Sequence, residues 1–285
     1  ILPYSMTLIC LSIADGGQSE ELSLAQHVVR RKLVLELLDV LLRRYREVGE
    51  NKDYYLERTV HSVLCPTSVS ATDSAQLTSR RHDLWVVDER LTFGRAFASD
   101  RRIDGILADN SSALRPDLIV WDLAYGLSFF DGPEGEDPDI SNAISEMMII
   151  ELKKPMRKSY KKVEDNVEQQ VLKYINQLKR GEIEGFSRDR VRVKDDCVFH
   201  CFIVADIVGD LKQQIGSWAK TADGEGRYRV LEGDHRGSIT VVQWKDLIND
   251  AWMRNQATLN AAGLRRTSKL ITEMQQRLRE GDEVS

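Results

Sequence analysis

Hydrophobic residues recur at helical spacing in several parts of the chain. The longest of these begins at Ser23, which can cap a helix, and continues to about Glu47, shortly before Gly49. The same spacing predicts further helices over 54–64, 165–178 and 245–256. A terminal helix is expected around three regularly spaced hydrophobic residues, which are Leu270, Met274 and Leu278.

Short apolar runs between these helices predict strands. The runs 115–122 and 147–152 are joined by a segment containing 131–139, whose glycine, proline and acidic residues predict a hairpin loop. Residues 198–205 are almost continuously apolar, as in a central strand covered on both faces. Weaker signals predict a loop over 66–81, a strand turning into a helix over 82–91, and an edge hairpin from 228–231 and 238–242. Strands mixed with helices predict an α/β (α+β) fold.

Composition is that of a folded protein whose surface is not basic throughout. The chain has 285 residues, of which 42% are hydrophobic and 30% charged, enough for one substantial core. Its formal net charge of -5 at pH 7 excludes a surface that is basic throughout, so any nucleic acid must bind to a local patch. No stretch reaches the roughly 18 apolar residues that span a membrane. We expect no membrane partner.

The cysteines show no framework spacing, which favours the reducing cytoplasm over a secreted location. Cys197, His200 and Cys201 are close enough to suggest zinc. They fall in the apolar run near 198–205, where successive side chains point to opposite faces, so a buried strand is favoured. Because the chain begins with Ile1 and its first residues lack a basic leader, we expect the carboxy-terminal part of a longer protein.

Two of the apolar runs carry charged residues suited to phosphodiester hydrolysis. Asp117 lies at the start of one run, and Glu151, Leu152 and Lys153 end the other. Side chains alternate along a strand, so Glu151 and Lys153 share a face while Leu152 points into the core. If the two strands pair, two carboxylates and one ammonium converge. Carboxylates suit a hard cation such as Mg²⁺ (or Mn²⁺), and an amine can hold or deprotonate the attacking water.

Residues downstream add to this pattern. Gln170 and Tyr174 follow each other at the border of the buried face of the predicted helix 165–178. The densest basic stretch comprises Lys154, Arg157, Lys158, Lys161 and Lys162, for which phosphate contact and a solvated surface are equally compatible. A purely structural Glu151–Lys153 ion pair is the alternative to a catalytic site, but such pairs are costly to desolvate.

The arrangement resembles the PD-(D/E)XK nuclease superfamily. The order of segments from Glu57 through 84–91 to Tyr174 also looks like the carboxy-terminal region of large bacterial proteins that carry a GHKL-type ATPase domain. A weaker similarity is to the nuclease domain of Shedu-type phage-defence proteins. The resemblance covers about Leu22 to Leu264. It implies a restriction-endonuclease-like core, in which helices flank a mixed central β-sheet, with an N-terminal helical segment.

The resemblance also implies roles for single residues. Asp117 and Glu151 match the metal-binding acids, and the carbonyl of Leu152 matches a further ligand. Lys153 matches the catalytic lysine.

Three other matches lie on the two helices. Gln170 and Tyr174 match the residues that brace the lysine and the substrate phosphate. Glu57 matches an acidic residue that reaches a second metal ion or its water, and Glu89 is its rival for that role. Val167 departs from the family, which often has proline after the asparagine found here as Asn166.

We expect three parts: an N-terminal helical segment over 1–50, a PD-(D/E)XK nuclease-like domain over 51–256, and a helical tail over 257–285. The expected activity is Mg²⁺-dependent endonuclease cleavage of nucleic acid, DNA foremost, leaving a 5′-phosphate and a 3′-hydroxyl. The resemblance implies the effector part of a larger, ATPase-linked antiviral defence protein of bacteria. Expected partners are nucleic acid, the ATPase domain of the same protein and a second copy of the chain. The alternatives are a non-cleaving nucleic-acid-binding module and an oligomerisation module built on the long amino-terminal helix.

Overall fold

The computed structural model describes residues 18–48, 54–70, 82–93, 97–103, 107–108, 114–121, 143–161, 165–184, 190–222 and 224–264. Within these ranges, several side chains near the ends of helices and strands are not described, and that of Glu57 is one of them. The predicted hairpin loop 131–139, the predicted terminal helix around Met274, and Lys162 lie outside the described residues.

The chain divides into two compact units. One combines 1–40 with 250–285, and the other covers 41–249. The helices α2 (Gln18–Val48) and α6 (Trp244–Ala261) each run from one unit into the other. The predicted boundaries at residues 50 and 256 divide the same chain differently and stay a prediction.

Hydrogen bonds join α2 to α6 inside the first unit. Arg31 Nη1 donates to Asn255 Oδ1 at 2.7 Å, and Trp252 Nε1 donates to Asp39 Oδ2 at 3.3 Å. Because α2 begins at Gln18, Ser23 lies inside the helix, and the expectation that Ser23 caps it was wrong.

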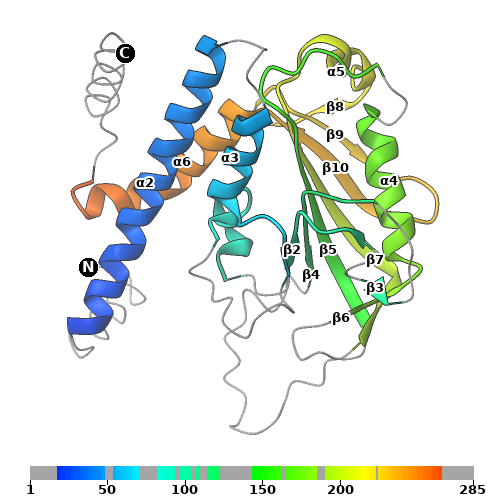
Figure 1. The fold of residues 1–285 in the computed structure, drawn as a ribbon, viewed down its shortest axis with the longest axis horizontal. Coiled ribbons are helices and arrows are strands. Elements are labelled where there is room, and N and C mark those ends of the chain that lie inside the picture. The colour runs from blue at the N-terminus through cyan, green and yellow to red at the C-terminus, as the bar shows by residue number, and fades with distance from the viewer. Residues whose placement is uncertain are drawn as a thin grey trace, which may run out of the picture. The chain divides into compact units, whose positions relative to one another are not determined.

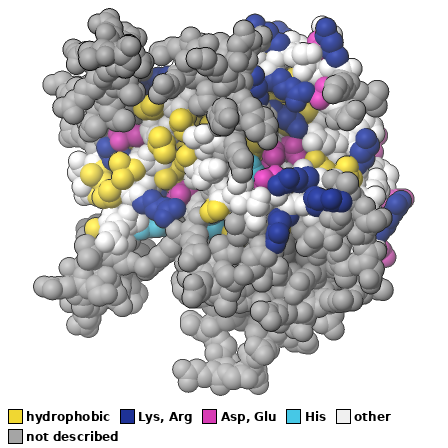
Figure 2. All heavy atoms as spheres, in the orientation of Figure 1, with side chains coloured by type: hydrophobic (Ala, Val, Ile, Leu, Met, Phe, Trp, Pro, Cys, Tyr) yellow, Lys and Arg dark blue, Asp and Glu magenta, His cyan; other side chains and the backbone are white. Residues whose placement is uncertain are grey.

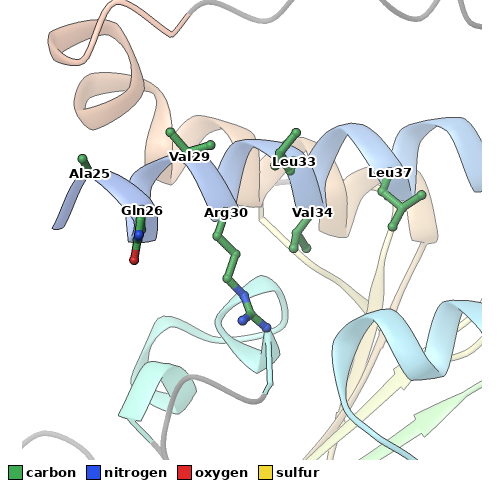
Figure 3. A pocket seen from close by; sticks show the side chains of 7 residues that line it. All are labelled: Ala25, Gln26, Val29, Arg30, Leu33, Val34 and Leu37. Carbon is green, nitrogen blue, oxygen red and sulfur yellow. The ribbon is translucent and has the colours of Figure 1, made fainter. Parts of the chain in front are cut away.

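One face of α2 is apolar and exposed. Val29, Leu33 and Leu37, here called the α2 stripe, are 42%, 57% and 45% exposed. Their spacing of four residues places them in one row along the helix. They line a groove of about 480 Å³ together with Ala25, Gln26, Arg30 and Val34 (Figure 3). Figure 2 shows hydrophobic side chains gathered on the face that carries α2.

The second unit contains a mixed β-sheet. Its main path runs in the order β1-β2-β4-β5-β7-β10-β9-β8, while β3 pairs with β6, and β6 also pairs with β7. The strands are β1 (Val69–Ser70), β2 (Phe97–Ser99), β3 (Leu107–Ala108), β4 (Leu118–Trp121), β5 (Ala143–Leu152), β6 (Glu182–Glu184), β7 (Arg190–Val204), β8 (Ala219–Lys220), β9 (Arg227–Val230) and β10 (Arg236–Val242). The pairs β5·β7 and β7·β10 are parallel, and the other pairs are antiparallel. The predicted mixed sheet flanked by helices is confirmed.

The remaining helices differ from expectation in detail. α3 (Tyr54–Leu64) and α4 (Val167–Leu178) occupy the predicted segments, and α5 (Gly209–Gln214) was not predicted. The segment predicted as a strand turning into a helix contains two 3-10 helices, η3 (Leu84–Val86) and η4 (Glu89–Phe93), so its strand was wrong. The predicted hairpin is confirmed as β9 and β10, but β10 lies inside the sheet because β7 pairs with its other side.

Alternation along the central strands places α4 against one face of the sheet (Figure 1). Met147 and Ile149 of β5 share the core with Val171 and Ile175 of α4. Glu151 is the next residue on the same face of β5, so strand alternation brings it to the end of this core beside α4. Cys197 and Cys201 are each 1% exposed in β7, as expected for a buried strand. Among the described residues, the structure contains no helix of the length and apolarity that crossing a membrane requires.

Candidate active site

The antiparallel pairing of β4 with β5 brings Asp117 beside Glu151. Leu118 faces Ile150 across the two strands, which places Asp117 opposite Glu151 at the strand ends. The backbone N–H of Asp117 donates to Glu151 Oε1 at 3.3 Å, and the N–H of Leu152 donates to Asp117 Oδ2 at 2.7 Å. The two carboxylates therefore converge, as the sequence predicted.

Lys153 completes the charged group. Its Nζ donates to Glu151 Oε2 at 2.9 Å, and the two residues are 9% and 3% exposed. Burial disfavours the ammonium, but the neighbouring Glu151 carboxylate, its hydrogen bond and the charge of Asp117 outweigh burial and raise the pKa of Lys153. The ammonium is thus held in its charged form beside two carboxylates.

Gln170 of α4 connects the acidic and basic groups. Its Oε1 accepts from Lys153 Nζ at 2.8 Å, while its Nε2 donates to Glu151 Oε2 at 3.1 Å and to the Tyr174 hydroxyl at 2.7 Å. Asn166 caps α4 by accepting from the N–H of Gln169 at 2.9 Å, which fixes the first turn of the helix. Burial, followed by the nearby negative charge of Glu151, raises the pKa of the Tyr174 phenol. The sequence-predicted pair Gln170 and Tyr174 therefore lies at the carboxylates.

The backbone of Lys153 is fixed by residues that the sequence did not indicate. Its N–H donates to the carbonyl of Val204 at 2.8 Å, and its own carbonyl accepts from Trp244 Nε1 at 2.8 Å. Trp244 is 2% exposed at the start of α6. A tryptophan at the start of a helix resembles any core residue in sequence, so only the fold reveals this contact.

The segment that follows Lys153 is also anchored. Met156 N–H donates to Asp206 Oδ2 at 2.8 Å, and Tyr160 N–H donates to Asp210 Oδ2 at 3.0 Å. The N–H of Asp210 donates in turn to the carbonyl of Lys158 at 2.9 Å. The loop is therefore held to the start of α5, where a Cβ on Gly209 would collide with the Lys158 carbonyl.

The basic residues of this loop differ in their surroundings. Arg157 pairs with Asp165 at 2.6 Å and lies over the Tyr160 ring at 4.4 Å, so its guanidinium holds the loop itself. Lys158 and Lys161 are exposed, and Lys154 is half-buried. Within the described part of the chain, neither Lys158 nor Lys161 forms an ion pair. Lys158 and Lys161 are thus the better placed of the predicted phosphate contacts.

The two candidates for an additional acidic residue lie on different elements. Glu57 lies on α3, but its side chain is outside the described residues, and Glu89 is exposed on η4. His61 follows Glu57 by one turn of α3. It is 6% exposed, and its Nε2 lies 2.9 Å from Ser99 Oγ. Burial lowers the pKa of His61, while the charges of Asp100 and Glu151 act against it.

The donor set of the site fits magnesium. No cluster of three or more His, Cys, Asp or Glu side chains suited to a metal ion occurs among the described residues. Magnesium is commonly held by one or two carboxylates, with water and substrate phosphate completing its shell. Asp117 and Glu151 provide two such carboxylates side by side, and Lys153 balances one of their charges. Ligation by the Leu152 carbonyl stays a prediction.

Comparison of the chain with protein-family models, curated proteins and solved structures finds no match in any of the three. The function proposed below therefore rests on the geometry around Asp117, Glu151 and Lys153.

Proposed function

We propose that the chain is a metal-dependent nuclease of the PD-(D/E)XK type that hydrolyses phosphodiester bonds in DNA. The observation that carries the proposal is the convergence of Asp117, Glu151 and Lys153 at the adjoining ends of β4 and β5. Gln170 and Tyr174 support it, because they meet the same carboxylate from α4. A buried cluster of this kind is costly in desolvation, and catalysis gives a reason for keeping it.

The fold supports a restriction-endonuclease-like core. The site strands β4 and β5 are antiparallel, and β5 pairs in parallel with β7 on its other side. The helix α4 packs on the face of β5 that bears Glu151. The strands β4 and β5 and the helix α4 each contribute residues to the site, which lies where β4 begins and β5 ends. This agrees with the arrangement that the resemblance to the nuclease superfamily implies.

The chain's residues divide the work of hydrolysis. Asp117 and Glu151 would hold Mg²⁺ (or Mn²⁺), which supplies an activated water and neutralises charge on the phosphate. Lys153 positions the attacking water or a phosphate oxygen through its Nζ. Gln170 orients the Lys153 ammonium and the Glu151 carboxylate through both ends of its amide. Lys158 and Lys161 bind the phosphate backbone beside the site without reading base sequence.

Metal-dependent cleavage of linear, circular and single-stranded DNA tests the proposal. We expect the wild-type chain to cut circular DNA with Mg²⁺ or Mn²⁺, and D117N and E151Q to lose at least a hundredfold in rate. E146Q is the matched control, because Glu146 lies on the same strand and its side chain is 45% exposed. Equal cleavage by wild type and the double variant D117N/E151Q contradicts the proposal.

The resemblance extends the proposal to the cellular role. In that role the chain is the effector part of an ATPase-linked antiviral defence protein of the bacterial cytoplasm. Phage challenge of cells that carry the full-length protein, with and without E151Q, tests this role. Equal phage resistance in the two strains contradicts it.

A second candidate function is assembly of subunits through the long helix. The α2 stripe favours it, since single exposed hydrophobic residues are common but a row of three on one helix is not. We expect self-association of the wild-type chain, weakened by L33E. Identical sedimentation of the two proteins at all concentrations contradicts this function.

A further inference from the structure

A second charged group lies beside the proposed active site, around Arg115. The Arg115 Nε donates to the Asp100 carbonyl at 2.9 Å and lies 2.7 Å from Asp100 Oδ1 in an ion pair. Its Nη2 donates to Asp100 Oδ2 at 2.8 Å and to Ser68 Oγ at 3.4 Å. Two residues far from Arg115 in sequence, Asp100 and Ser68, thus hold its guanidinium in a single orientation.

The backbone around Arg115 is strained. Ser68 and Asp100 have φ angles of +62° and +51°, in the left-handed region that residues other than glycine seldom adopt. In the described part of the chain the third such residue is Met156, at +58°, in the anchored loop after Lys153. Strained backbone persists where surrounding contacts enforce it and is concentrated at functional sites. Asp100 and Met156 lie in segments next to Asp117 and Lys153, and Ser68 lies beside Asp100.

The Arg115 group is coupled to the active-site strands. The N–H of Asp100 donates to the carbonyl of Asp117 at 2.7 Å, so the residue that orients Arg115 also holds the backbone of Asp117. The electrostatic environment of His61 includes both the Arg115 guanidinium and the Glu151 carboxylate. Arg115 is therefore close to the site and connected to it through Asp100.

A contribution to folding stability does not explain why Arg115 is held by Asp100 and Ser68. The Arg115 side chain is 48% exposed, and ion pairs with such exposure contribute little to folding. Of its N–H donors, Nη1 meets no hydrogen-bond acceptor among the described residues. Arg157 is different, because it pairs with Asp165 and covers the Tyr160 ring. A fixed guanidinium with donors directed to solvent is suited to bind phosphate.

We propose that Arg115 binds a phosphate of the nucleic acid next to the bond that is cleaved, with Asp100 and Ser68 as its positioning residues. The proposal rests on the proposed nuclease function, which identifies the bound strand as nucleic acid. Lys158 and Lys161 hold the backbone from the loop after Lys153, and Arg115 holds it from the segment before Asp117. The substrate is then a strand that continues past the site on both sides, which suits internal cleavage.

Equilibrium DNA binding tests the proposal without requiring cleavage. Fluorescence anisotropy with a labelled duplex, in the absence of divalent metal and over a range of salt concentrations, is measured for wild type, R115Q, R115K and R229Q. R229Q is the matched control, because Arg229 lies on a different strand, β9, and its side chain is 37% exposed. Like Arg115, it forms ion pairs, with Glu168 at 3.3 Å and with Glu232 at 3.0 Å. Thermal unfolding of each variant establishes that it is folded.

We expect R115Q to bind about tenfold more weakly and to lower the slope of log K against log salt by about one, while R229Q keeps both wild-type values. R115K is expected to keep the slope and lose about threefold in affinity, because a lysine ammonium lacks the forked donors with which a guanidinium can bind Asp100 and a phosphate together. If R115Q does not fold, the R115K affinity decides. Wild-type binding by R115Q, or by R115K in that case, overturns the proposal, as does a wild-type chain that binds no DNA.

Cleavage assays on the same proteins separate this inference from the proposed function. A chain whose binding depends on Arg115 but which never cleaves with Mg²⁺ or Mn²⁺ contradicts the nuclease and supports the Arg115 contact. If the wild-type chain cleaves with metal and R115Q keeps the wild-type affinity for DNA, the nuclease is supported and the Arg115 contact is contradicted.

Discussion

Replacing Lys153 alone should destabilise the fold, whereas replacing it together with Glu151 should leave stability nearly unchanged. In K153M the Glu151 carboxylate stays buried after losing its cationic partner, whereas E151Q/K153M removes both charges. Breaking a buried ion pair costs about 3–5 kcal/mol, while replacing the whole pair by neutral residues of similar volume is close to neutral or stabilising. The sign of this difference reports whether the pair serves folding or chemistry.

The structure places K153M near the lower end of that range. Two contacts of the Glu151 carboxylate survive, from Gln170 Nε2 at 3.1 Å and from the Asp117 N–H at 3.3 Å. We therefore expect K153M to lose about 3 kcal/mol of unfolding free energy. For a unit of this size that corresponds to a fall in Tm of roughly 6–12 °C. The double variant should stay within about 1 kcal/mol of wild type.

Urea unfolding followed by circular dichroism at pH 7 measures these differences. The single variants K153M and E151Q and the double variant E151Q/K153M form a complete double-mutant cycle with wild type. A double variant less stable than K153M would show that the pair holds the fold together and would refute the reasoning. Equal stability of K153M and wild type would refute the burial on which the magnitude depends.

Three further predictions concern pH, metal and packing. Burial lowers the pKa of His61 from 6.5, so as pH falls the unfolded chain binds this proton at a higher pH than the folded chain does. The free energy of unfolding should therefore fall as pH drops below 6.5, and it should fall less steeply in H61Q. Added Mg²⁺ should raise the Tm of wild type but not of E151Q, measured by differential scanning fluorimetry, since a metal that binds only the folded state stabilises it; an equal rise in both would contradict ligation by Glu151. G237A should lose at least about 3 kcal/mol in urea unfolding, because Gly237 has a φ of +125° and its added Cβ would collide with the Phe199 backbone. G233A, at a position where a Cβ meets nothing within 4 Å, is the control and should lose less.

Local patterns were sufficient to predict the elements that carry the site. Alternation in the run ending at Lys153 predicted a strand, and helical spacing around Gln170 predicted α4, since both signals depend only on neighbouring residues. The same patterns misassigned the segment 82–91 because short buried apolar runs suit a strand and a 3-10 helix equally. They also left β10 at an edge, because parallel pairing with β7 is a contact between distant segments.

The amino-acid sequence by itself determined which chemical groups the site contains: two carboxylates, an ammonium, an amide and a phenol on predictable strands and a helix. Only the tertiary structure decided their distances and their neighbours. Trp244, Asp206, Ser68 and Asp100 act across large separations in the chain, and nothing in their local sequence distinguishes them from ordinary core or loop residues. Hydrogen bonds and burial depend on which segments meet in space, and that is fixed when the sheet assembles.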